Sequence, residues 1–315
     1  MALSRSELES TSTPFYTKDI MSQVYDESAF FNKLKRNNSI VTDGGTEIRF
    51  PIRYKELAQA EAVDPRTQIV YQQTATRTSG KLDWKYYKAD TMIQWDEQVQ
   101  NSGKEKVINL LADKAEELKD DIGEKFADDL FATTQATKSF SGLITIVDTA
   151  TTYADIAVAD AASWAAAVED TSTTRLELYG SGSLSYNINT STFGKNMPSL
   201  IITSRNLKSK AESLLQPQER FIDKDTADAG FNNIAFLGIP IVGDSHCPAG
   251  YMYGLDMDKF EMRVHKDFNF KTEPWSDLKQ VGFPNAQVKI MFWVGNLVCK
   301  MRKTSFRCTA LDYTL

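Results

Sequence analysis

The amino-acid sequence predicts an α+β fold, and three observations support this class. Residues 102–133 carry a long, uninterrupted helical pattern. Short runs alternate apolar and polar residues as strands do, above all 47–54, 81–97 and 287–310. The apolar run 199–203 leads directly into a helical pattern, which is half of an α/β unit. We therefore expect one long helix that rests on a sheet, followed by a mixed lobe and closing strands.

The composition describes an ordinary folded chain. It has 315 residues, of which 42% are hydrophobic and 25% charged, enough for one large or two ordinary domains. No apolar run approaches the roughly eighteen residues that cross a bilayer, and the first residues lack a secretory signal pattern. Cys247, Cys299 and Cys308 are too few for a disulfide framework and fit a reducing compartment. We expect synthesis in the cytoplasm and no contact with membrane.

The net charge of −6 argues against a chain whose purpose is its own affinity for nucleic acid. Such binding needs a concentrated basic face that attracts phosphates. If nucleic acid is involved, we expect something other than attraction to hold it.

The N-terminal segment divides into an arm and a helical pattern. Residues 1–14 are rich in Ser, Thr and Glu and predict a mobile arm. Residues 15–34 form a weakly amphipathic helical pattern, which can lie on a neighbouring copy or on its own domain. Its candidate contacts are Ile20, Val24, Phe30, Phe31 and Leu34.

Two predicted strands then bracket a polar excursion. The run 47–54 alternates, and Pro51 suggests an edge strand because proline cannot donate to a ladder. Residues 55–79 are polar, with a turn signal at Asp64-Pro65, and strand character returns over 81–97. Because long unstructured loops are unusual in compact domains, we interpret the excursion as a projecting arm.

The helical stretch 102–133 is the longest predicted element. Ser102 and Glu105 have the spacing of a capping box, and about thirty residues give a rod of roughly 45 Å. Its other faces are charged, so one stripe alone can rest on a sheet; the alternative is an ordinary amphipathic surface helix. The stripe consists of Val107, Leu111, Ala115, Leu118, Ile122, Phe126 and Leu130.

The second half of the chain predicts a separate lobe. Thr, Ala, Ser and Gly dominate 133–196, with a short helical patch at 161–168 behind Asp160. The strand 199–203 leads into a helix that we expect Ser204 to cap and Pro217 to end.

Short strands and turns follow over 232–270. In 287–310 every run has strand character, and Gly295-Asn296 is a predicted hairpin turn. We expect these closing strands to supply the sheet under the long helix, and Cys299 and Cys308 to be small core residues.

No motif predicts catalysis or a cofactor. Asp244-Ser245-His246-Cys247 contains a nucleophile and a base, but neighbours in extended backbone point to opposite faces, so a triad would need partners from elsewhere. His246 and His265 are the only histidines, no zinc spacing occurs, and the glycines at 180–182 lack a phosphate-loop pattern. We expect no enzyme, no metal and no cofactor.

One basic and aromatic stretch leaves two interpretations open. Lys81, Lys85 and Lys88 alternate with aromatic residues, as on a platform that stacks single-stranded nucleic acid. Half-exposed strands use the same residue types, and we favour that interpretation. The aromatic residues are Trp84, Tyr86 and Tyr87.

A family resemblance becomes visible in the second half of the chain. Its residues are Leu237-Gly238-Ile239-Pro240-Ile241-Val242, then Pro248-Ala249-Gly250, then Tyr253-Gly254-Leu255-Asp256. They resemble the pattern in major capsid proteins of tailed bacteriophages that share the HK97 fold. The order of elements extends the resemblance over nearly the whole chain: a mobile arm, a two-stranded excursion, a long helix, an α/β lobe and closing strands.

The resemblance implies a domain organisation. The N-terminal arm would span 1–45, the extended two-stranded E-loop 46–97, the spine helix of the P domain 98–139, the α/β A domain 140–284 and the closing P-domain strands 285–315. The insertion at 171–196 has no counterpart in this scheme. The resemblance also implies assembly contacts in the E-loop, at Glu56, Asp64, Pro65, Arg66 and Arg77, and a core face of the spine helix at Val107, Leu111, Leu118, Ile122, Phe126 and Leu130.

The implied function is structural. Copies would assemble as hexamers and pentamers into an icosahedral shell that encloses double-stranded DNA by confinement, with scaffolding, portal and decoration proteins as further partners. Assembly would take place in the host cytoplasm and the protein would end in the virion. An encapsulin-like protein compartment is the alternative within the same fold, and a phage tail or other structural binding protein is the alternative outside it.

Overall fold

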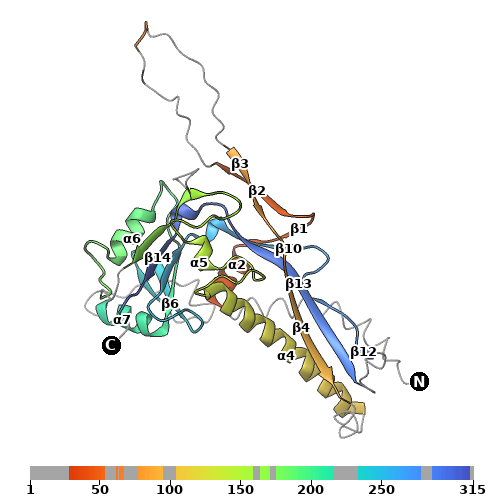
Figure 1. The fold of residues 1–315 in the computed structure, drawn as a ribbon. Coiled ribbons are helices and arrows are strands. Elements are labelled where there is room, and N and C mark those ends of the chain that lie inside the picture. The colour runs from red at the N-terminus through yellow and green to blue at the C-terminus, as the bar shows by residue number, and fades with distance from the viewer. Residues whose placement is uncertain are drawn as a thin grey trace.

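The computed structural model describes residues 28–53, 62, 64–66, 77–94, 104–158, 164–170, 175–215, 233–277 and 286–312. These residues form two six-stranded sheets and one two-stranded sheet, with the long helix α4 (Lys104–Phe131) lying along the first sheet (Figure 1). Within these ranges no helix is both long enough and apolar enough to span a membrane.

The first sheet is built on one long strand, β13 (Gln287–Cys299). One edge of β13 pairs antiparallel with β4 (Lys85–Ile93) over nine register positions, from Gln287↔Ile93 to Gly295↔Lys85. The other edge takes three strands in succession, and a fourth strand pairs parallel with one of them. These are β10 (Phe260–His265), β11 (Lys271–Thr272), β12 (Ser276–Asp277) and, next to β10, β1 (Ile40–Asp43).

The predicted hairpin turn at Gly295-Asn296 is wrong, because β13 runs through both residues. A Cβ atom added at Gly295 would lie 2.6 Å from the ring of Trp293 and 2.7 Å from the carbonyl oxygen of Arg263. The glycine is therefore required by close packing inside a strand. Besides a turn, such close approach is a common reason for a glycine within a strand pattern.

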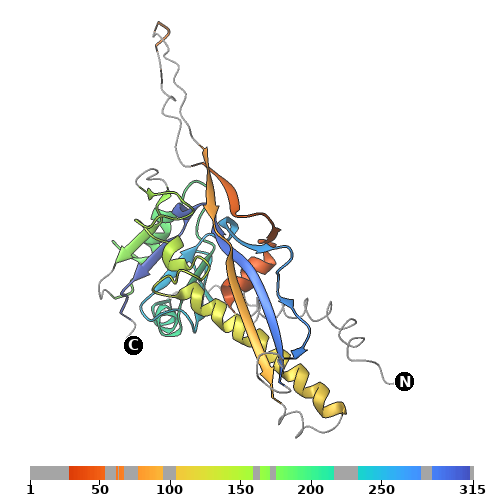
Figure 2. The ribbon, with the colours of Figure 1, turned by 45° about the vertical axis from the view of Figure 1, so that its right-hand side comes forward.

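Helix α4 covers one face of the paired strands β4 and β13, as both ribbon views show (Figures 1 and 2). The ring of Phe126 lies 4.6 Å from that of Trp293 on β13 and 5.1 Å from that of Tyr87 on β4. Leu118, Ile122, Phe126 and Leu130 are buried. The Ser102 and Glu105 pair and the side chains of Val107, Leu111 and Ala115 lie outside the described parts.

A short helix, α2 (Ala29–Arg36), packs beneath the same core. Phe31 contacts Phe126 with ring centroids 6.2 Å apart, and Phe30 contacts Phe260 at 5.7 Å. The helical pattern 15–34 left two alternatives, packing on a neighbouring copy or on its own domain. Phe30 and Phe31 pack on their own domain. Residues 1–27, including the predicted contacts Ile20 and Val24, lie outside the described residues.

The second sheet has the strand order β5-β14-β9-β6-β8-β7. This sheet contains the predicted pair of a strand and a helix: β6 (Leu200–Ser204) leads directly into α7 (Arg205–Leu215). The remaining strands are β5 (Ala167–Asp170), β7 (Asn233–Phe236), β8 (Ile239–Asp244), β9 (Met252–Leu255) and β14 (Phe306–Thr309). The other helical elements are α5 (Leu143–Ile146), α6 (Leu184–Ser191) and two 3-10 turns, Met257–Lys259 and Arg302–Thr304.

Two local predictions in this lobe are wrong. Residues 161–163 of the predicted helical patch 161–168 lie outside the described residues, and its last residues, Ala167 and Val168, belong to strand β5 and pair with β14. At these two positions the edge of the sheet overrides the alanine-rich pattern. Ser204 does not cap α7 with its side chain. Its hydroxyl has no hydrogen-bond partner, because the residue is the last of strand β6 and is held in the ladder opposite Asp244.

The third sheet is the antiparallel hairpin of β2 (Ile48–Arg53) and β3 (Arg77–Leu82), which extends beyond the first sheet (Figure 2). Ile48, Phe50 and Ile52 are buried, while Pro51 is exposed on a strand with a single described neighbour. Trp84 links the hairpin to the core, because its indole N–H donates to the carbonyl oxygen of Gly45 at 2.9 Å.

The strand pairings cross the predicted segment boundaries. The first sheet takes β1 from segment 1–45, β4 from segment 46–97 and β10, β11 and β12 from segment 140–284. The second sheet takes β14 from segment 285–315. Strand partners are distant in sequence, and a local pattern does not specify them.

Candidate assembly site

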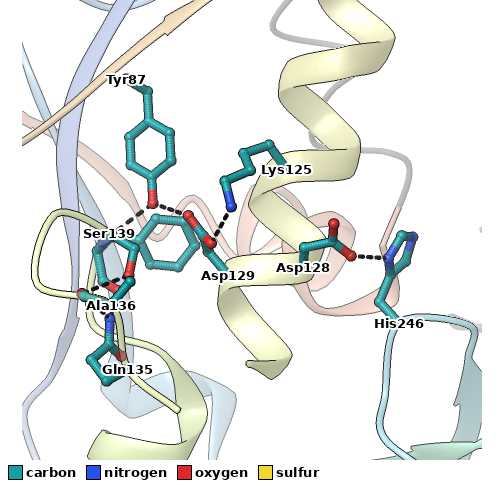
Figure 3. A network of polar contacts seen from close by, with 9 residues as sticks. Tyr87, Lys125, Asp128, Asp129, Gln135, Ala136, Ser139 and His246 are labelled. Atoms are coloured by element: carbon teal, nitrogen blue, oxygen red, sulfur yellow. Dashed lines mark hydrogen bonds and ion pairs between the residues drawn. The ribbon is translucent and has the colours of Figure 1, made fainter. Parts of the chain in front are cut away.

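The end of α4 is anchored to the first sheet by a buried carboxylate (Figure 3). The Tyr87 hydroxyl donates to Asp129 Oδ2 at 2.6 Å and accepts from the backbone N–H of Phe140 at 3.0 Å. Lys125 Nζ lies 2.8 Å from Asp129 Oδ1, one helical turn away. Burial, together with the bond to Asp129, raises the pKa of Tyr87, so the phenol keeps its proton and remains a donor.

A single glutamine organises the loop that follows the helix. Gln135 accepts from the backbone N–H of Gly142 at 2.7 Å and donates to the carbonyl oxygen of Phe140 at 2.8 Å. Its amide also donates to Ser139 at 2.6 Å. A Cβ atom at Gly142 would lie 2.7 Å from the carbonyl oxygen of Asp129, so only glycine permits this close return. The loop thereby brings the Phe140 ring to 5.7 Å from that of Phe126.

The neighbouring carboxylate connects the helix to the second sheet. Asp128 Oδ1 lies 2.8 Å from Nδ1 of His246, in the loop after β8 (Figure 3). At the end of β8, Asp244 accepts from the hydroxyl of Ser28 at 2.9 Å and from the backbone N–H of His246 at 3.0 Å. Consecutive residues of α4 therefore bind two different sheets, so the last turn of the helix connects these sheets. We call this connection, through Asp128 and Asp129, the joint.

The segment from Asp244 to Cys247 contains the residue types of a nucleophile and a base, but in the structure it forms part of this joint. His246 Nδ1 faces Asp128. Burial, together with nearby Asp244, raises the pKa of Cys247, which disfavours the thiolate needed for nucleophilic attack. In the described ranges, no three His, Cys, Asp or Glu side chains gather in a geometry that could hold a metal ion.

Two buried arginines add a connection that the sequence patterns did not reveal. Arg302 is fully buried, and its guanidinium donates to the carbonyl oxygens of Ile146 at 2.5 Å and Asp148 at 2.8 Å. Arg307 donates to the carbonyl oxygen of Ile144 at 2.8 Å and to Asp148 Oδ1 at 3.1 Å. These bonds attach the α5 region to the C-terminal strands. Neither a single arginine in a turn, as Arg302 is, nor one within a strand, as Arg307 is, carries a periodic signal that would have identified it.

The predicted assembly contacts are exposed where they are described. Asp64, Pro65 and Arg66 are exposed at a turn, and Arg77 is exposed at the start of β3. Glu56 lies outside the described residues. The described side chains of the predicted α4 stripe, Leu118, Ile122, Phe126 and Leu130, are instead buried. The described members of the two predicted groups therefore lie apart, one group at the surface and one in the core.

Residues 81–88 do not form the platform of exposed aromatic rings that could stack single-stranded nucleic acid. Trp84 is buried and bonded to Gly45, and Tyr87 packs against Phe126 and Trp293. Of the three aromatic residues only Tyr86 presents a largely exposed ring, at 74% relative exposure. Alternation along β4 divides the rings between two faces.

Comparison with known proteins finds its matches among solved structures. No protein-family model and no curated protein sequence matches the chain. The chain is similar to the structure described as the cyanophage A-1(L) capsid asymmetric unit, with a TM-score of 0.62 and 17% identity over 87% of this chain and 90% of the other. It is also similar to the capsid of the native GTA particle, with a TM-score of 0.59 and 9% identity over 90% and 91%.

A third similarity is to the holo-SrpI encapsulin complex from Synechococcus elongatus PCC 7942. The TM-score is 0.54, with 6% identity over 90% of this chain and 89% of the other. At such low identity the likeness concerns the fold, and it runs nearly end to end in each pair. The chain therefore has the fold found in phage capsids, as the resemblance to HK97-type proteins predicted.

Proposed function

We propose that this chain is a major capsid protein whose copies assemble into a closed icosahedral shell around double-stranded DNA. The observation that supports this most is the extent of the structural match: 87% of this chain aligns with 90% of the cyanophage capsid chain. A likeness confined to one sheet would fit many proteins, whereas this one covers about nine tenths of both chains.

The HK97-type elements follow from this proposal. Helix α4 is the spine helix, and together with β4, β10 and β13 it forms the P domain. The hairpin β2–β3 and the chain between its strands form the E-loop, and the second sheet with α6 and α7 forms the A domain. The joint at Asp128 and Asp129 supports a subunit in which the P and A domains move as one body, because adjacent residues bind both.

The partners follow from the same proposal. Copies would group as hexamers and pentamers, with scaffolding, portal and decoration proteins as further partners. Packaged DNA would be confined by the wall and need not be attracted to it, which suits a chain of net charge −6. We further propose that the protein is assembled in the host cytoplasm, ends in the virion, and acts without catalysis or a cofactor.

The test is to express the chain, alone and with a scaffolding protein from the same genome, and to measure sedimentation at several concentrations with negative-stain imaging. Closed shells of uniform size are expected. A stable monomer under every condition would overturn the proposal.

An encapsulin-like compartment is the second candidate, and the match to the SrpI complex favours it. The contents of shells purified from the native source distinguish the two. Nuclease-protected DNA of uniform length supports the capsid, whereas a protein cargo without DNA supports the compartment. Rings or tubes in place of shells would favour the third alternative, a tail or other structural binding protein.

A further inference from the structure

The turn between β1 and the hairpin β2–β3 carries the one Asp-Gly pair in the sequence, Asp43-Gly44. Asp43 is the last residue of β1, and its side chain is 35% exposed. Gly44 and Gly45 are exposed as well. Solvent therefore reaches both the carboxyl group of Asp43 and the peptide bond that follows it.

The carboxyl group of Asp43 lies against the next backbone nitrogen. The N–H of Gly44 donates to Asp43 Oδ1 at 2.9 Å. The carboxyl carbon, Cγ, is bonded to that oxygen and so lies close to the same nitrogen. Reacting atoms that are held about 3–3.5 Å apart are near the geometry of attack. Attack of the Gly44 nitrogen on Cγ closes a five-membered imide ring.

Two glycines follow Asp43, and the fold requires only the second. Gly45 has a φ of +112°, where a residue with a side chain is strained. A Cβ atom added at Gly44 would meet Lys266 Cε at 3.8 Å, which is an ordinary contact. The missing side chain of Gly44 is therefore not needed for packing, but it leaves the backbone nitrogen unhindered.

We propose that Asp43 cyclises onto the nitrogen of Gly44 in the folded protein and is slowly converted to isoaspartate. The nitrogen bonds to Cγ, and one carboxyl oxygen leaves as water with the amide proton and one proton from solvent. Water then reopens the ring and a proton returns to solvent. Cleavage between the nitrogen and Cγ restores aspartate, whereas cleavage between the nitrogen and the backbone carbonyl carbon of Asp43 gives isoaspartate. Water is the only other reactant.

Arg263 restrains this reaction. Its guanidinium lies 2.7 Å from Asp43 Oδ2 and 3.3 Å from the carbonyl oxygen of Arg49 in β2. The ion pair holds the carboxyl group in one orientation, and it has to open before the ring closes. Arg263 therefore sets the rate at which Asp43 is converted.

Conversion changes the connection between the first sheet and the hairpin. Isoaspartate routes the backbone through Cβ and Cγ, which adds one carbon between β1 and Gly45. Before this point the carbonyl oxygen of Asp43 accepts from the N–H of Lys266 at 3.0 Å, and after it the carbonyl oxygen of Gly45 accepts from the indole of Trp84 at 2.9 Å. Both hydrogen bonds depend on the normal spacing, so conversion loosens the base of the hairpin.

The experiment ages the full chain for several weeks at neutral pH and physiological temperature. Isoaspartate is measured by labelling with isoaspartyl methyltransferase and located by peptide mapping. Asp43 should hold about tenfold more isoaspartate than any other described aspartate. Gly44→Ala should keep the Tm of the original chain and lower the content at Asp43 about tenfold, because the added Cβ hinders the nitrogen. Arg263→Gln should raise the content severalfold, because it removes the ion pair.

Asp244 is the internal control, because it also precedes a small residue. It is 8% exposed, and its carboxylate accepts from Ser28 and from the N–H of His246, not from the next residue. Isoaspartate at Asp43 with little at Asp244, and less at Asp43 in Gly44→Ala, supports the proposal. Equal contents at the two aspartates, or an unchanged content in a folded Gly44→Ala chain, overturns it.

The same measurement on the chain unfolded in urea shows whether the folded structure permits the reaction. If isoaspartate at Asp43 forms only in the unfolded chain, the proposal is wrong. The inference goes beyond the proposed shell function and is judged separately from it, because isoaspartate is measured in the same way whether or not the chain assembles.

Discussion

The last turns of α4 and the hairpin β2–β3 use their side chains differently. At the helix, Phe126 packs against the rings of Tyr87, Phe140 and Trp293, and buried Asp129 has two polar partners. At the hairpin, one face is buried and the other exposes cations with like-charged neighbours. The first region contributes stability to the single subunit, whereas the exposed face of the second places like charges opposite one another, which opposes the pairing of its strands.

This contrast predicts the largest loss of stability at the buried stripe of α4. Ile122→Asp would place a carboxylate at a side chain that is 2% exposed, inside an apolar cluster. We expect a cost of about 3–5 kcal/mol and subunits that misfold, measured by denaturant unfolding and soluble yield. Asp121→Asn, at the adjacent exposed position, is the control and should be nearly neutral. A soluble Ile122→Asp chain with an unchanged unfolding midpoint would mean that the stripe is not buried.

The polar part of the joint should matter less than its apolar part. Tyr87→Phe keeps the ring but removes the hydroxyl that serves Asp129 and Phe140. A cost of about 1–3 kcal/mol is expected, because a buried carboxylate and a backbone N–H each lose a partner. Tyr86→Phe makes the same change on the exposed face of β4 and should leave the unfolding free energy unchanged. Equal effects of the two substitutions would argue against the network in Figure 3.

A smaller effect depends on pH. Burial by itself raises the pKa of Asp148, but hydrogen bonds from Thr151 and Ala150 and the charge of Arg307 outweigh it and lower that pKa. A carboxylate whose pKa is lower in the folded state stabilises above its unfolded pKa, and this stability is lost as pH falls. The free energy of unfolding should therefore decline below about pH 4, and less steeply in Asp148→Asn. If the free energy of unfolding declined equally in both chains as pH falls, Asp148 would not be the cause of the decline.

The smallest change in folding is expected at the segment between β2 and β3. Deleting residues 59–72 and closing the strands with a short turn removes mostly polar residues and should leave the subunit nearly as stable. Shell assembly should be lost, since an arm that lies on a neighbour is ordered by that contact.

Limited trypsin digestion gives an independent measurement on the intact chain. Free subunits should be cut at Arg66 and Arg77, and assembled subunits should be protected at both. Equal cleavage in the two forms, or normal shells from the deleted chain, would contradict an assembly role for this segment.

Local patterns predicted some features well. Apolar spacing of three and four residues located α4, and the side chains of Leu118 and Phe126 are buried. Cys299 and Cys308 are buried, as expected of small core residues. The same reasoning failed at Gly295, where a turn signal lies within a strand, and at residues 167–168, where an alanine-rich stretch pairs with a sheet edge.

The sequence by itself determined the existence of the long helix, the alternating faces of the hairpin and the acidic balance of the chain, because each follows from residues near one another or from composition. Only the tertiary structure decided that Asp128 and Asp129 bind different sheets, that Arg302 bonds to the carbonyl oxygens around α5, and which strands flank β13. These contacts join positions far apart in the chain. Their energy depends on burial and on exact distances, which no local pattern carries.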